Sequence, residues 1–334
     1  MLHNRTSSDQ FVAEPYLISH LLKDKDFAYK VAKSQNDAYY AGIGENPPAF
    51  LEAGDEKKTV DKSAKEEKIA INLAGFYALE CGVGALCERD GEKPTAWLAR
   101  IIGGEMDVQD IFLLNHFANA TWKAGQPFRG LDRITRSVFT VFSLLPQEEK
   151  EKDFVQIQNA AVKLLMSMDA IRDASAGEQM DFIKGLLQDE TFTIEMAKFL
   201  AAAYYTGQNQ ESPQFISEEE ELATVTKSAS EEKIAMNLAG FYALESGVDY
   251  LVSIQNRLPS EILRSITGDT IIPAERQLMC RLANATWKAG QPFRSLDRIT
   301  REVFKPFDLL SEEDKSKDWA QIAGAAAIVL AELG

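Results

Sequence analysis

The chain has few of the side chains on which enzymes most often depend, with only three histidines and three cysteines among its 334 residues. No set of them has the spacing of a zinc site. The sequence also has no P-loop, no dinucleotide-binding glycine motif and no nucleophile elbow of the hydrolase type. These absences predict a protein that is not an enzyme and carries no metal or cofactor.

Long apolar segments and positive charge are also scarce. No apolar run approaches the roughly 20 residues of a membrane span, and the first residues have no apolar stretch of signal-peptide type. The three cysteines do not form a repeated framework and are interpreted as reduced thiols. A net charge of −15 argues against a general binder of DNA or RNA duplexes, which needs a broad basic face. We therefore expect a cytoplasmic protein without a membrane or duplex partner.

The chain does contain a long internal repeat, at an offset of 165 residues. Residues 118–136 and 283–301 are identical at 18 of 19 positions, and residues 66–80 and 231–245 at 14 of 15. Between these two blocks, only 7 of the 35 pairs from 83–117 and 248–282 match. No histidine occurs at equivalent positions of both copies. Uneven divergence indicates that the two blocks have been kept while the segment between them changed.

The repeat predicts two tandem helical modules of a mainly α fold, covering residues 1–169 and 170–334. Apolar residues recur at helical spacing over 27–40, 63–88, 107–123 and 148–166 and in the second copy of each. Ser63 with Glu66, and Ser228 with Glu231, have the spacing of a capping box at a helix start. Strand signals are few, with short extended pairs expected near Thr140 or Phe304.

The C-terminal part of each module resembles the RyR domain, the repeat first named from ryanodine receptors and also found in bacterial and phage proteins. The matching pieces are NATW at 119–122 and 284–287, then VFTVFSLLPQEEKEKDF at 138–154 and VFKPFDLLSEEDKSKDW at 303–319. Asn119 and Asn284 stand where the family motif has histidine. The resemblance implies a ligand-sensing module, and one version is a phage-encoded sponge for a nucleotide messenger of host immunity.

The first block combines aromatic residues with cations, four basic residues and one aspartate giving each copy a charge of +3. We expect a helix to end near Gly125 and the next one to place three arginines on one face. Guanidinium groups bind phosphate bidentately, and an aromatic ring can stack on a base. The candidate ligand-binding residues are Trp122, Lys123, Gln126, Phe128, Arg129, Arg133 and Arg136, with Trp287, Lys288, Gln291, Phe293, Arg294, Arg298 and Arg301 in the second copy.

The same residues also have a structural interpretation. The tryptophan can belong to the core, the lysine sits where a cation favours a helix C-terminus, and Asp132 can pair with Arg136.

The second block contains a glycine inside a helix, Gly75 and its copy Gly240, which costs about 1 kcal/mol relative to alanine. Keeping it twice indicates the close approach of another backbone or of a ligand. Packing against the tryptophan-bearing helix is one interpretation. In the other, the wall of the same pocket includes Asn72, Tyr77, Asn237 and Tyr242.

Together these features predict non-catalytic binding of a small anionic ligand of nucleotide type. The main alternative is a structural or protein-interaction module whose arginines form internal salt bridges. A hydrolase or transferase acting on a nucleotide is a third option, disfavoured by the lack of a shared histidine or cysteine. A homo-oligomer is left open.

Overall fold

The computed structural model describes residues 7–42, 45–52, 54–207 and 209–334. These residues form fifteen α-helices, six short 3-10 helices (η) and a two-stranded sheet. With 76% of the structure helical, the prediction of a mainly α fold is confirmed. The prediction of short extended pairs near Thr140 and Phe304 is wrong. Beside them lie η3 (Phe142–Leu144) and η6 (Phe307–Leu309), whose carbonyls accept from N–H groups three residues later rather than from a neighbouring strand.

The elements of the two halves follow in the same order along the chain. The first half contains α1 (Ser7–Lys23), α2 (Lys25–Gly42), η1 (Asp55–Lys57), β1 (Thr59–Ser63), α3 (Ala64–Ile71), α4 (Ala74–Asp90), α5 (Pro94–Gly103), α6 (Val108–Arg129), η2 (Leu131–Thr135), η3 and α7 (Gln147–Ser167). The second half, after η4 (Asp169–Ile171), contains α8 (Ala176–Gln188), α9 (Glu190–Gly207), α10 (Glu218–Leu222), β2 (Thr224–Ser228), α11 (Ala229–Met236), α12 (Ala239–Gln255), α13 (Pro259–Thr267), α14 (Pro273–Arg294), η5 (Leu296–Thr300), η6 and α15 (Glu312–Leu333).

Helix starts agree with the sequence better than helix ends. Ser63 and Ser228 cap α3 and α11, each accepting from the N–H three residues on. The single helix expected over 63–88 is instead two helices, α3 and α4, which meet at a bend of 42°. Asn72 stands at this break, and its Nδ2 donates to the carbonyl of Lys68 at 2.8 Å.

The helix α6 was expected to end near Gly125, and this is wrong because it continues to Arg129. Gly125 does not end the helix but allows a close helix crossing, since a Cβ there would lie 3.0 Å from the ring of Phe293. Pro127 is tolerated because it stands in the last turn and removes one backbone bond only.

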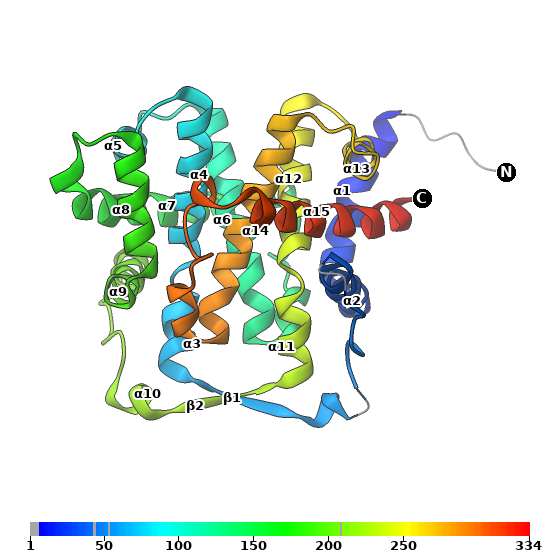
Figure 1. Cartoon of the computed structure of the whole chain (residues 1–334), viewed down its shortest axis with the longest axis horizontal. Helices are drawn as coiled ribbons and strands as arrows, with labels where there is room; N and C mark the ends of the chain where they lie inside the picture. The colour runs from blue at the N-terminus through cyan, green and yellow to red at the C-terminus, as the bar shows by residue number, and fades with distance from the viewer. Residues whose placement is uncertain (1–6, 43–44, 53, 208) are drawn as a thin grey trace.

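The centre of the molecule is formed by α6 and α14, which pack on each other with α4 and α12 beside them (Figure 1). Gly75 of α4 and Gly240 of α12 meet α7 and α15, where a Cβ would lie 3.0 Å from Gln156 Cβ and 2.8 Å from Gln321 Cβ. The repeated glycines therefore admit a neighbouring helix. That helix is the last one of each half and not the tryptophan-bearing helix expected from the sequence.

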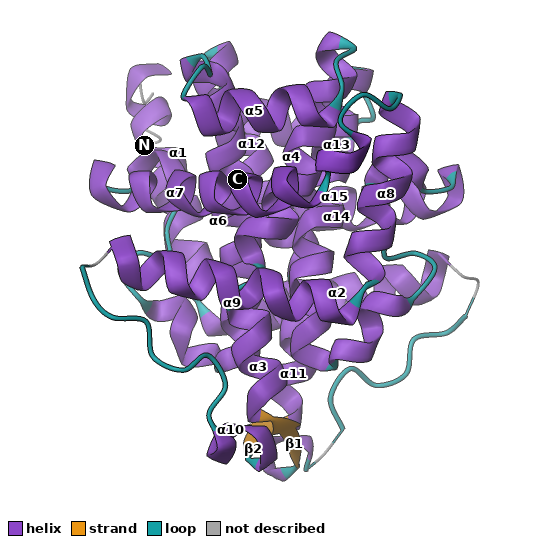
Figure 2. Ribbon diagram, turned by 90° about the vertical axis from the view of Figure 1, so that its left-hand side faces the viewer, coloured by secondary structure: helices purple, strands orange, loops and turns teal. Residues whose placement is uncertain are grey.

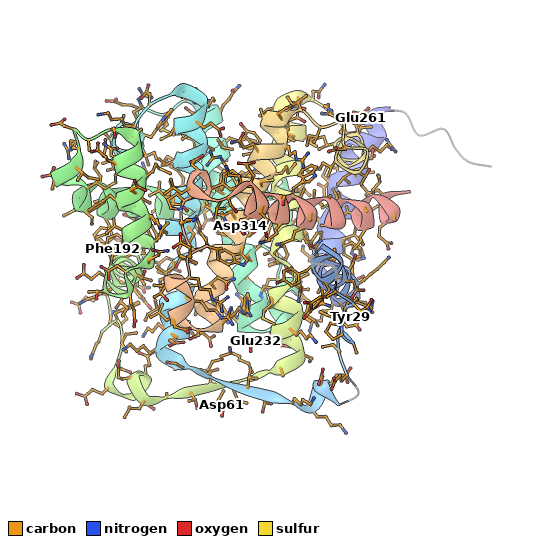
Figure 3. All side chains as sticks on the ribbon, in the orientation of Figure 1. Tyr29, Asp61, Phe192, Glu232, Glu261 and Asp314 are labelled. Atoms are coloured by element: carbon orange, nitrogen blue, oxygen red, sulfur yellow. The ribbon has the colours of Figure 1, made fainter. Side chains whose placement is uncertain are left out.

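The two halves exchange their first helices. In Figure 1, α1 and α2 lie on the right against α13 and α15 of the second half, and α8 and α9 lie on the left against α5 and α7 of the first. The contacts match in detail. Phe27 meets Phe241 edge to face at 5.6 Å, and Phe192, labelled in Figure 3, meets Phe76 at 5.8 Å. Each half thus completes its core with helices from the other.

A two-stranded antiparallel ribbon, β1 with β2, joins the halves at one end of the molecule, below α3 and α11 (Figure 2). Its register pairs Asp61 with Thr226, which is the equivalent residue of the other half. The ribbon, the helix exchange and the α6–α14 contact therefore share one approximate two-fold axis.

Among the described residues, no single helix is long and apolar enough to cross a membrane. Taken together, the bent pair α3–α4 has the length and apolar composition of a span. Most residues of α4, however, are buried in the protein core.

Candidate functional site

The two lysines of the first block are buried between the halves. Lys123 Nζ lies 2.6 Å from Glu245 Oε2, and Lys288 Nζ lies 2.5 Å from Glu80 Oε2. Both lysine side chains are 0% exposed. The prediction of a ligand role for Lys123 and Lys288 does not agree with this placement, because each ammonium is held by a carboxylate of the opposite half.

Phe128 and Phe293 are also used between the halves. Their rings stack with centroids 5.5 Å apart and planes 8° apart. The cavity that they line beside the ribbon has a volume of about 20 Å³, room for roughly one water molecule. They therefore do not offer an open aromatic wall to a ligand.

Arg129, Arg133 and Arg136 come together at the end of α6, although not on one helix. Arg129 is the last residue of α6, Arg133 lies in η2, and Arg136 follows η2. Burial, and then the charges of Arg133 and Arg136, lower the pKa of Arg129 to about 10. Burial and Arg136 likewise lower the pKa of Arg133. We call these three residues the first arginine cluster.

The second arginine cluster repeats the first. Burial, then Arg298 and Arg301, lower the pKa of Arg294 to about 10, and burial with Arg301 lowers that of Arg298. Within the described parts of the chain, no carboxylate lies within 4.0 Å of the guanidinium nitrogens of either cluster. The ion pair considered for Asp132 and Arg136 is not formed. Each cluster therefore concentrates positive charge in an otherwise acidic protein.

Two carboxylates near the clusters, Glu67 and Glu232, pair with lysines of the ribbon. Glu67 holds Lys227 at 2.9 Å, and Glu232, labelled above the ribbon residue Asp61 in Figure 3, holds Lys62 at 2.5 Å. These ribbon lysines also donate to the last carbonyls of the central helices, Lys62 to Arg294 at 3.0 Å and Lys227 to Arg129 at 3.4 Å.

Glu66 and Glu231 are engaged as well. Glu231 Oε2 accepts from the Leu131 N–H at 3.1 Å, and Glu66 Oε2 from the Leu296 N–H at 3.2 Å. The capping glutamates predicted at the starts of α3 and α11 thus reach across and fix the turn that carries the arginines of the other half. The turn is held by carboxylates that leave the guanidinium groups unneutralised.

Gln126 and Gln291 are buried one helical turn before the first arginine of each cluster. Their Nε2 atoms donate back to Trp122 and Trp287, at 3.4 and 3.2 Å, and both Oε1 atoms lack a described partner. Buried Nε of Arg129 also has none. Because a buried polar atom without a partner costs free energy, these atoms require a partner such as a water molecule or a ligand group.

The residues of the second block lie apart from the clusters. Asn72 and Asn237 close the last turn of α3 and α11, donating to Lys68 and Lys233. The rings of Tyr77 and Tyr242 are buried edge to face on Phe304 and Phe139, at 5.5 and 5.4 Å. The tyrosines belong to the core, as the packing interpretation of this block expected, and they do not line a pocket with the arginines.

Trp122 is half-buried and lines a separate cavity of about 490 Å³ between α6, α7 and α9. Asn119 stands one turn before it on α6, and its Nδ2 donates to Asp153 Oδ2 at 3.3 Å. Burial raises the pKa of Asp153 to about 7, against the opposing effects of Asn119 and Lys123. The sequence did not single out Asp153, although it recurs as Asp318 in the repeat.

Among the described residues, no three histidine, cysteine or acidic side chains are grouped to hold a metal. No family model, curated protein or solved structure matches the chain. The resemblance to the ryanodine-receptor repeat therefore stays a prediction.

Proposed function

We propose that the two arginine clusters bind a small anionic ligand of nucleotide type without transforming it. The observation that carries the proposal is the gathering of three guanidinium groups, twice, with no carboxylate at ion-pair distance within the described chain. Bringing like charges together and partly burying them is unfavourable unless a counter-charge joins them. A phosphate group fits such a cluster, because each planar guanidinium can donate two parallel hydrogen bonds.

Arg129 and Arg294 are the central residues of this proposal, since each is half-buried and next to two further arginines. Sequestration of a nucleotide messenger, as the family resemblance implies, is the biological role that we propose for such binding. Two clusters give the chain two sites of equal chemistry.

The test is a thermal-shift and calorimetric screen with pyrophosphate, ADP-ribose, NAD fragments and cyclic di- and trinucleotides. At a hundredfold excess over Kd, a ligand stabilises the folded state by about 2.7 kcal/mol, which raises the melting temperature by a few degrees. The variant Arg129→Glu/Arg294→Glu should lose this shift. Arg172→Glu is the matched control, because Arg172 is an exposed arginine outside both clusters.

Mass spectrometry of the ligand released on denaturation separates a binder from an enzyme, since a binder returns it unchanged. Equal affinity in the wild type and in Arg129→Glu/Arg294→Glu would contradict the proposal.

A structural or protein-interaction role is the second candidate, and it too has an observation in its favour. The buried pairs Lys123–Glu245 and Lys288–Glu80 show that part of the repeated block joins the halves. This role predicts internal salt bridges for the cluster arginines, and none is formed among the described residues. A screen in which no anion stabilises the protein would favour it.

A further inference from the structure

The cavity of about 490 Å³ between α6, α7 and α9 has a lining opposite in charge to the arginine clusters. Its charged residues are four carboxyl groups and one ammonium: Glu148, Glu149, Glu151, Asp153 and Lys152. The size is that of a small-molecule pocket. A cavity with this balance of charge repels phosphate and attracts cations.

The start of a helix does not account for this lining. Acidic residues favour the first turn of α7 through the helix dipole, which explains Glu148 and Glu149. Glu151 and Asp153 lie beyond that turn, and Asp153 is buried. Lys152 pairs with Glu149 at 2.7 Å and Glu148 at 3.3 Å, so it neutralises only part of the charge.

A second, independent observation is a buried acceptor at the cavity wall. Asn119 lines the cavity and is 3% exposed, and its Oδ1 has no hydrogen-bond partner among the described residues. Its Nδ2 is already used by Asp153. The amide thus presents an unsatisfied acceptor, which a ligand N–H group would satisfy.

The equivalent acceptor of the second half has a sulfur neighbour. Asn284 Oδ1 lies 3.7 Å from Cys81 Sγ, and the thiol also has Glu80 Oε2 as an acceptor at 3.2 Å. The residue at the position of Cys81 in the other half is Ser246, and its hydroxyl turns to Glu245 at 3.4 Å. Asn284 Oδ1 therefore has a sulfur atom within reach, whereas Asn119 Oδ1 has no hydrogen-bond partner among the described residues.

The contact between the last helix of each half and the helix that covers it also differs between the halves. Gln35 of α2 donates to the carbonyl of Gln321 on α15 at 2.8 Å. Gly324 allows this approach, since a Cβ there would lie 3.3 Å from Gln35 Nε2. The first half has Leu200 and Asn159 at these positions, and both line the cavity.

Aromatic and apolar groups complete the cavity. Trp122 forms part of its wall, and Val155 and Tyr204 line it although they are 47% and 57% exposed. An ammonium group is attracted to the face of an aromatic ring as well as to carboxylates. The exposed apolar residues suit the body of an organic molecule better than a hydrated metal ion.

We propose that this cavity of the first half binds a small organic cation, with its ammonium group toward Asp153, Asn119 and Glu149 and its apolar body against Trp122. The site is distinct in chemistry from the arginine clusters. It does not depend on their binding an anion.

The test compares molecules with and without an ammonium group. Calorimetry on the full chain uses phenethylamine and spermidine as ammonium probes and 2-phenylethanol as the uncharged equivalent of phenethylamine. We expect at least one amine to bind and 2-phenylethanol to bind at least tenfold more weakly. Absence of binding by both amines, or equal binding of the alcohol and phenethylamine, overturns the proposal.

Variants place the site in one half. Asp153→Asn keeps shape and removes charge, and Trp122→Leu removes the ring; each should weaken amine binding tenfold or more. Asp318→Asn and Trp287→Leu are the matched controls at equivalent positions, and both should bind as the wild type does. Equal losses in Asp153→Asn and Asp318→Asn overturn the placement.

Proton linkage gives a further readout. The charged groups that line the cavity with Asp153 are Glu148, Glu149, Glu151 and Lys152 of α7. Lys123 of α6 also acts on Asp153, and the titratable lining residue of α9 is Tyr204. Because the cation prefers the ionised carboxyl, affinity should fall by up to about tenfold for each pH unit below 7. Asp153→Asn should lose this dependence, and a dependence that persists there contradicts the role of Asp153.

The source of the cation is decided by adding Nα-acetyl-lysine methylamide. Binding of this derivative supports recognition of a lysine side chain on a protein. Binding of spermidine or phenethylamine without it supports a free amine.

Discussion

Phe128 and Phe293, which are equivalent residues of the two halves, stack on each other with ring planes 8° apart. Gly125 lies against the Phe293 ring, and Gly290 lies against the Phe128 ring. A Cβ at either glycine would lie 3.0 Å from that ring. A change at either phenylalanine or at either glycine disturbs this contact. This favours keeping the repeated block around Gly125 and Phe128. It does not account for the arginines beyond.

Removing one partner of a buried ion pair should be strongly destabilising. Lys123→Met leaves the Glu245 carboxylate buried and uncompensated, so we expect the free energy of unfolding to fall by about 3–5 kcal/mol. Adding Glu245→Leu should recover most of the loss, because an apolar pair replaces the ionic one. Urea unfolding of the single and double variants measures both steps. A single variant as stable as the wild type would argue against the pair.

The glycines at the contacts between α4 and α7, and between α12 and α15, should not accept a methyl group. A Cβ at Gly240 would lie 2.8 Å from Gln321 Cβ, so Gly240→Ala forces the helices apart and should cost about 1–3 kcal/mol. Gly177→Ala is the control, since a Cβ there meets nothing within 4 Å. Thermal unfolding of both variants decides the point, and equal melting temperatures would contradict the packing argument.

Stability should depend on pH through two buried carboxyls. Burial raises the pKa of Asp153 to about 7 and that of Asp318 to about 8, above the ordinary value of 3.8. At a pH between the pKa of the carboxyl in the unfolded state and its pKa in the folded state, the carboxyl is protonated when the protein is folded and ionised when it is unfolded. The free energy of unfolding therefore falls as pH rises from about 4 to 8.

The variant Asp153→Asn/Asp318→Asn should lack this decline. Its melting temperature should rise relative to the wild type as pH increases, by an amount worth on the order of 4 kcal/mol for each residue. Melting curves from pH 4 to 9 test this. A constant difference between the two proteins across that range would be inconsistent with raised pKa values.

The exchange of first helices should make the halves dependent on each other. Cutting the chain between Asp173 and Ala174, which lie in the exposed turn after η4, leaves each half without the helices that cover its core. We expect the two pieces to co-purify as a one-to-one complex and neither alone to unfold cooperatively as a monomer. Light scattering and calorimetry provide the measurement. A stable monomeric half would be contrary to the exchange.

The sequence was most informative about local structure. Serine caps, prolines at first turns and helical periodicity located most helices, because these signals act within one turn of chain. It failed where a tertiary contact decided the outcome. Gly125 has the usual appearance of a helix stop, yet it is the point at which α14 crosses α6, and only the position of Phe293 reveals this.

The candidate site was predicted in part for the same reason. The arginines could be recognised because their charge stands out locally, whereas Lys123 looked equivalent until Glu245 was found beside it, 122 residues away. The cavity around Asp153 depends on α6, α7 and α9 together. No spacing within a single segment indicates it.

The segment that has changed most between the copies contains the pairs in which the halves differ. His116 binds Asp249 at 3.1 Å, while its equivalent, Arg281, binds Glu88 at 2.8 Å and also Asp308. Gly84 stands at the position equivalent to Asp249 and lies beside Arg281. The contact between the halves at His116 and Asp249 is thus replaced, at the equivalent place, by contacts of Arg281 with Glu88 and Asp308.

The covalent linkage of the two halves permits this divergence. If the two halves were separate identical chains, the extent of their association would depend on concentration. Any substitution would also appear in both chains of the dimer. Within one chain the meeting is intramolecular and independent of dilution. Because the exchanged helices always find the opposite half, each half is free to diverge, and Asn119 Oδ1 can lack a described partner while Asn284 Oδ1 lies beside the Cys81 sulfur.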